Sequence, residues 1–147
     1  MPAQKWIEPR TYYQKLLLTM PSGAERTVLN ILYSHIGLAD AIQKPELITG
    51  CQQHGTKFSD ERQLRLTIVK LRKAGVPVCA SSGESGYFLA SSLDEYAEFR
   101  DREYVKKIVD MRETVTAMDE QIKQMFPADY DNYRKQKAMA AGQPQLL

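Results

Sequence analysis

The side chains best suited to recognising a partner lie in one basic segment, residues 57–73. It carries six Lys and Arg residues against two acidic ones, a net charge of +4. Arginine and glutamine can hydrogen-bond to base edges in the major groove of DNA, while lysine and arginine neutralise its phosphates. The candidate DNA contacts are the outward and flanking positions of this segment: Lys57, Arg62, Gln63, Arg65, Leu66, Thr67, Lys70 and Lys73.

The elements that must present this segment follow from the apolar periodicity around it. Apolar residues recur at helical spacing from Leu64 to Leu71, and Ser59 before them is the expected N-cap. A shorter helix is expected to begin with Thr49 as its N-cap and to end at about His54. Two helices joined by a tight turn, the second one longer, form a helix-turn-helix pattern.

An earlier helix is expected to begin at Ser22, because Ser22 and Glu25 have the spacing of a capping box. Its apolar positions recur as far as Ile36, and Gly37 is expected to end it. Residues 41–42, in the linking segment that follows, could add a strand to a sheet.

Residues 76–90 have the pattern of a β-hairpin. Two short apolar runs, 76–80 and 87–90, flank a segment rich in serine and glycine. Neither this hairpin nor the short helix would be stable without packing on a helical core. Three helices followed by a hairpin indicate a mainly α (α+β) fold, with a winged helix-turn-helix domain at residues 22–92 and a long C-terminal helix behind it.

A resemblance to known proteins becomes specific in this region. The segments Ile48–Gly50, Ser59–Arg65, Leu71–Val78 and Gly86–Ala90 resemble small winged-helix DNA-binding proteins of bacteriophages and prophages. They are also similar to the N-terminal winged helix of biotin-operon-type repressors. The resemblance covers about residues 22–92, under half of the chain. It implies sequence-dependent binding of double-stranded DNA in transcription regulation or DNA replication, in the host cytoplasm if the chain is phage-encoded.

The C-terminal part carries a heptad pattern. Seven apolar residues are separated alternately by four and three positions, a seam typical of a two-stranded coiled coil. In a parallel pair Lys107 would face Arg112, so an antiparallel homodimer is at least as favourable. The seam could also bind another helix, or pack back onto the winged helix or the N-terminal arm. The expected oligomer or partner contacts are Tyr104, Ile108, Met111, Val115, Met118, Ile122 and Met125.

Composition sets the remaining limits. The chain has 147 residues, of which 43% are hydrophobic and 26% charged, and its formal net charge is +2. These values exclude global disorder and a histone-like polycation. The expected organisation is an arm (1–21) packed as a short strand or helix, the winged helix (22–92), the long helix (93–126), and a short helix with a loose tail (127–147). No membrane-spanning or signal segment is visible, so we expect a cytoplasmic protein without membrane contact.

The sequence offers little support for catalysis or metal binding. Cys51, Cys79, His35 and His54 would suffice in number for one zinc ion, but they lack the paired spacing of zinc motifs. Two buried free thiols are the favoured interpretation. No phosphate-binding glycine loop precedes a helix, and the serines between residues 81 and 92 have no nearby histidine base. We therefore expect no catalytic residues, no metal and no cofactor.

A second hypothesis is a protein-binding adaptor that engages a host or replication protein through the winged helix and the long helix. Glu84 at the wing tip would repel DNA phosphates, and Asp60 and Glu61 begin the basic helix. Leu66 and Val69 on its outer face would suit a protein surface.

Overall fold

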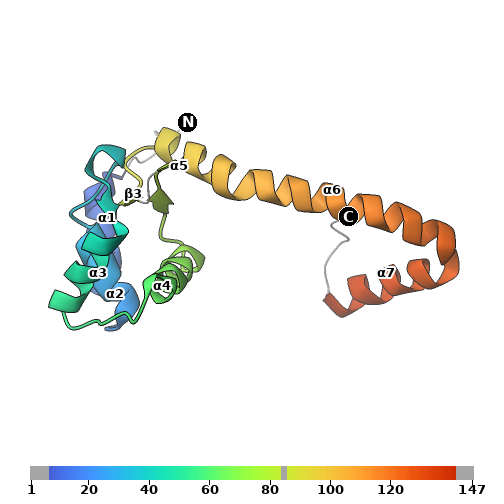
Figure 1. Ribbon diagram of the computed structural model, residues 1–147, viewed down its shortest axis with the longest axis horizontal. Coiled ribbons are helices and arrows are strands. Elements are labelled where there is room, and N and C mark those ends of the chain that lie inside the picture. Colours follow the sequence, from blue (N-terminus) through green and yellow to red (C-terminus); the bar gives the residue numbers. More distant parts are fainter. Residues whose placement is uncertain (1–6, 84–85, 142–147) are drawn as a thin grey trace, which may run out of the picture. The chain divides into compact units, whose positions relative to one another are not determined.

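The computed structural model describes residues 7–83 and 86–141, and it divides the chain into two compact units that meet after Arg100. The described chain is mostly helical, with one small antiparallel sheet (Figure 1). The predictions for Glu84 and for the loose C-terminal tail lie outside the described residues. The elements of the N-terminal unit are α1 (Pro9–Thr19), α2 (Ala24–Leu32), a 3-10 turn (Leu38–Asp40), β1 (Ile42–Gln43), α3 (Lys44–Gln53), α4 (Glu61–Lys73), β2 (Val78–Ala80), β3 (Gly86–Leu89) and α5 (Leu93–Arg100).

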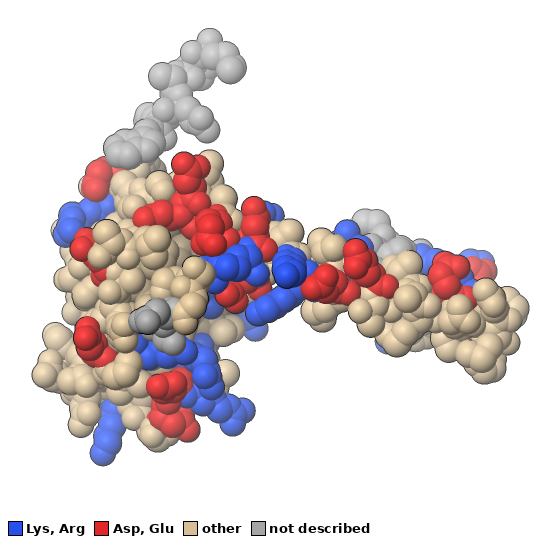
Figure 2. Space-filling model, turned by 45° about the horizontal axis from the view of Figure 1, so that its top comes forward, with Lys and Arg blue, Asp and Glu red and all other residues tan. Residues whose placement is uncertain are grey.

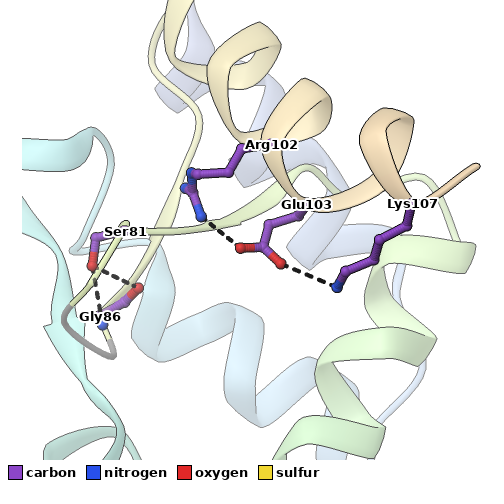
Figure 3. A network of polar contacts seen from close by, with 5 residues as sticks. All are labelled: Ser81, Gly86, Arg102, Glu103 and Lys107. Carbon is purple, nitrogen blue, oxygen red and sulfur yellow. Dashed lines mark hydrogen bonds and ion pairs between the residues drawn. The ribbon is translucent and has the colours of Figure 1, made fainter. Parts of the chain in front are cut away.

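The sheet joins the predicted hairpin to the strand that follows α2. Its order is β1-β3-β2, and both pairings are antiparallel, with Ile42 opposite Tyr87 and Cys79 opposite Phe88. Ser81 and Gly86 close the hairpin turn. The Ser81 N–H donates to the Gly86 carbonyl over 2.9 Å. The Gly86 N–H donates to the Ser81 hydroxyl over 3.2 Å, as Figure 3 shows. The predicted hairpin and the extra strand at residues 41–42 are thus present.

The main core lies between the helices and one face of the sheet. The predicted stripe of α4 is fully buried, with exposed fractions of 0% for Leu64, 1% for Ile68 and 0% for Leu71. It packs with buried residues of α2 and with Tyr87 and Leu89 of β3. α2 contacts both α3 and α4, so it supports both helices from one side.

A second, smaller core explains why α5 belongs to the N-terminal unit. Phe88 and Ala90 alternate with Tyr87 and Leu89, so they face the opposite side of the sheet, where they pack with Phe99 of α5. Both faces of β3 are therefore buried.

Glu95 ties the start of α5 to the segment after α2. Its carboxylate accepts hydrogen bonds from the backbone N–H groups of Leu38, over 2.8 Å, and Ser91, over 2.9 Å. Partial burial disfavours the charged form, but these bonds and one from the Ser91 hydroxyl outweigh it, so the pKa of Glu95 lies below its ordinary value.

The N-terminal arm forms a helix, α1, anchored by one buried tyrosine. Tyr13 is 3% exposed, and its hydroxyl donates to the Ala90 carbonyl over 2.6 Å. Burial raises the pKa of Tyr13, so the hydroxyl keeps its proton and remains a donor.

Replacing Tyr13 by Phe should lower the free energy of unfolding by about 1–3 kcal/mol, because the buried Ala90 carbonyl then lacks the hydroxyl that donates to it. Tyr12→Phe is the matched control: that residue is 42% exposed, so a change within about 0.5 kcal/mol is expected. Urea unfolding followed by circular dichroism measures both, and equal effects would contradict the anchoring role of Tyr13.

Three predicted helix starts were wrong. α2 begins at Ala24 after Gly23, without a side-chain cap, so the Ser22–Glu25 capping box does not form. α3 begins at Lys44 with a proline in its first turn, which places Thr49 inside the helix. α4 is capped by Asp60 instead of Ser59, because the Asp60 carboxylate accepts from the Gln63 N–H over 3.0 Å. The predicted end of the first helix was also late, since α2 ends at Leu32.

The C-terminal unit contains a π-helical turn (Asp101–Val105), α6 (Lys106–Met125) and α7 (Pro127–Ala141). Glu103 bridges Arg102, over 2.6 Å, and Lys107, over 3.5 Å, where α6 begins (Figure 3). α7 extends to Ala141, so it is longer than the short helix expected in residues 127–147. It packs against α6, and the Tyr130 hydroxyl donates to the Asp119 carboxylate over 2.6 Å.

Candidate nucleic-acid interface

The interface candidate is the outer face of α4. The helix forms because Asp60 caps its first turn, while Lys70, Arg72 and Lys73 lie in the last turn, where cations interact favourably with the helix dipole. Its apolar stripe faces the core. The opposite face is exposed to solvent and carries Arg62, Arg65, Leu66, Val69, Lys70 and Lys73.

Four of these residues are cations available to a partner. Within residues 7–83 and 86–141, Arg62, Arg65, Lys70 and Lys73 form no ion pair. Lys57, in the connection before α4, is exposed as well. Figure 2 shows that Lys and Arg side chains on the visible face of the N-terminal unit have Asp and Glu side chains among them. Positive and negative charges are therefore not segregated on this visible face.

Thr67 does not belong to this face. It is 7% exposed, and its hydroxyl donates to the Gln63 carbonyl over 3.0 Å. The predicted placement of Thr67 on an accessible flank of the helix is therefore wrong: its polar group is satisfied within the helix and the side chain packs inward.

Two other polar residues of the segment have structural contacts. The Gln63 side-chain oxygen accepts from the Ser59 N–H over 2.9 Å, so a base contact by this oxygen would compete with the start of the helix. The Arg72 Nε donates to the Val78 carbonyl over 2.8 Å, and its guanidinium lies 4.8 Å from the centre of the Phe99 ring. Arg72 thus joins α4 to β2 and α5. No sequence signal separated it from its basic neighbours.

The acidic residues at the start of α4 have a local explanation. Asp60 is the N-cap, and Glu61 lies in the first turn, where a negative charge stabilises the positive end of the helix. Their presence therefore needs no protein partner to explain it. This weakens one of the arguments for the adaptor hypothesis.

The heptad seam of the C-terminal unit is mostly open to solvent. The exposed fraction is 42% for Tyr104, 53% for Ile108, 68% for Met111, 56% for Met118, 38% for Ile122 and 61% for Met125. Val115 is half-buried, and no residue of α6 is buried.

The cysteines and histidines do not come together. Cys51 and Cys79 are free and buried in separate cores, and burial raises the pKa of the Cys51 thiol to about 11. In the part of the chain that the structure describes, no three His, Cys, Asp or Glu side chains could share a metal ion. A shallow depression of about 300 Å³ beside α1 is lined by Ile7, Pro9, Tyr12, Tyr13, Ala90, Ser91, Ser92 and Leu93.

Within residues 7–83 and 86–141, no helix has the length and apolar character needed to cross a bilayer.

Comparison of the chain with protein-family models, with curated proteins and with solved structures found no match. The features that bear on function are therefore the exposed faces of α4 and α6.

Proposed function

We propose that the chain is a non-enzymatic DNA-binding protein whose N-terminal unit is a winged helix, acting in transcription regulation or DNA replication. The observation that carries the proposal is the exposed basic face of α4, whose cations form no ion pair within the described residues. The chain order α2, β1, α3, α4, β2, β3 and the sheet order β1-β3-β2 match a winged helix, in which the first strand pairs with the last. The resemblance to phage and prophage winged-helix proteins supports the same function.

In this proposal α4 enters the major groove of double-stranded DNA. Arg62 and Arg65 have the side chains that pair with the O6 and N7 atoms of guanine, and Leu66 and Val69 could contact thymine methyl groups. Lys57, Lys70 and Lys73 would neutralise phosphates, which releases counterions and makes the affinity depend on salt.

Arg65→Ala and Lys73→Ala separate these two roles. Loss of a base contact should reduce affinity for the preferred site by about 1–3 kcal/mol and relax specificity, whereas loss of a phosphate contact should weaken binding to all sequences alike. Selection from a random duplex pool identifies the preferred site, and fluorescence anisotropy across a salt series measures both variants. No binding at low salt, or negligible effects of both changes, would contradict the proposal.

The adaptor hypothesis keeps one supporting observation. Leu66 is 51% exposed and Val69 is 37% exposed, side by side on the face that carries the cations. A protein partner would bury both. Co-purification from nuclease-treated extract distinguishes the two functions, because a partner that binds through DNA disappears after the treatment.

A further inference from the structure

The C-terminal unit presents an apolar face that its own helices leave open. α7 covers the row of α6 that contains Val115, Asp119 and Lys123, the three half-buried residues of its C-terminal half. The Tyr130 hydroxyl bonds to Asp119, and its ring lies 5.4 Å from the Lys123 ammonium. α7 therefore lies along one side of the heptad seam: it partly covers Val115 and leaves the other seam residues of α6 exposed. Helices of this length depend on packing of their apolar face for stability.

We propose that a second copy of this chain covers the seam, with the two α6 helices antiparallel and Val115 packed against the partner's Met118. The further core layers pair Met111 with the partner's Ile122 and Ile108 with the partner's Met125. Every layer joins a β-branched residue to a methionine. Because the two chains are related by two-fold symmetry, each of these pairings occurs twice in the dimer. This inference is independent of DNA binding.

The charges beside the seam select this register. The ionic residues at the flanking heptad positions are Lys107, Arg112 and Asp119. In an antiparallel pair, each flanking heptad position faces the equivalent flanking position of the partner helix. In the proposed register each Arg112 therefore faces the partner's Asp119, which makes two attractive pairs. On the other flank Thr114 faces the partner's Gln121, so no charges of the same sign meet.

The alternative arrangements bring like charges together. A parallel pair places Lys107 opposite the partner's Arg112, twice. Sliding the antiparallel pair by one heptad in one direction places Arg112 opposite the partner's Arg112, and sliding it in the other direction places Asp119 opposite the partner's Asp119. Because like charges in register are destabilising, the charge pattern fits a second copy in one orientation.

The position of α7 is compatible with this pair. It packs on the flank that carries Asp119, so both α7 helices lie on the same side of the two α6 helices. Two helical hairpins paired in this way form a four-helix bundle, the arrangement in which such apolar seams are normally buried.

The test is the mass of the full chain in solution, measured by sedimentation equilibrium without DNA, for wild type and charge variants. We expect a dimer. Arg112→Glu should raise its dissociation constant about tenfold, since both attractive pairs become repulsive. Asp119→Arg should do the same, and the combination of both changes should restore the wild-type value.

Each alternative gives a different result. A monomeric wild type overturns the inference. This is the result expected if the seam packs within the chain or binds only another protein. Stronger association of Arg112→Glu indicates the parallel pair, because Glu would then face Lys107. An unchanged dissociation constant indicates one of the two shifted antiparallel registers. Either result overturns the proposed register. Tyr130→Phe removes the hydrogen bond to Asp119 and keeps the carboxylate. A loss of dimer in this control as large as in Asp119→Arg would overturn the charge argument.

Discussion

Changing Arg62, Arg65 and Lys70 together to alanine is expected to lower the affinity for duplex DNA by roughly a hundredfold or more. Each of the two arginine contacts to bases contributes about 1–3 kcal/mol, and 1.4 kcal/mol corresponds to a factor of ten in affinity. The three side chains are exposed and make no ion pair with the described residues, so the fold should survive. The plot of log affinity against log salt concentration should also flatten, by about 0.9 for every phosphate that the variant no longer neutralises.

The matched control removes three cations elsewhere. Lys106, Lys135 and Lys137 are exposed residues of the C-terminal unit, and changing them to alanine also takes the formal net charge from +2 to −1. Anisotropy titrations at several salt concentrations should show a small effect for this control. If both triple variants lose affinity equally, binding follows the overall charge, and the assignment of α4 as the contact helix fails.

The core of the N-terminal unit could be predicted because it depends on periodicity alone. Leu64, Ile68 and Leu71 recur at helical spacing and are buried as expected. The hairpin was also visible, since two apolar runs flank a turn-forming segment. Such signals belong to neighbouring residues and need no knowledge of distant contacts.

The helix starts were harder to predict because several residues compete for each cap. Ser59 and Asp60 are adjacent and both suit an N-cap; the structure uses Asp60 as the cap, and Ser59 donates its N–H to Gln63. α3 extends back to Lys44 because Leu47 and Cys51 are both buried against the core, a tertiary effect that Thr49 as a local signal could not reveal.

The candidate site shows the same limit. Thr67 is polar, so its place on a helical wheel allowed an interface role, but its hydroxyl bonds to the Gln63 carbonyl one turn back, so its burial leaves no unsatisfied polar group. Arg72 differs from Lys70 and Lys73 only through its contacts with Val78 and Phe99, which no pattern among neighbouring residues reveals. The end of the N-terminal unit at Arg100 likewise depends on where Phe99 packs.

The largest effect on stability is expected from Leu64→Ala, which should lower the free energy of unfolding by about 2–5 kcal/mol. Leu64 is 0% exposed and packs between the helices of the core, so its removal leaves a cavity. Leu66, two positions along the same helix, is 51% exposed. Leu66→Ala makes the same chemical change and should alter stability by no more than about 0.5 kcal/mol.

Urea unfolding of both variants, followed by circular dichroism, therefore separates the two faces of α4. Similar losses in the free energy of unfolding for both variants would mean that Leu66 is buried in solution. The outer face of α4 could then not be an interface. If Leu66→Ala instead keeps the stability and weakens DNA binding, the exposed leucine contributes to recognition. The orientation of α4 would then be supported by two measurements that depend on opposite sides of one helix.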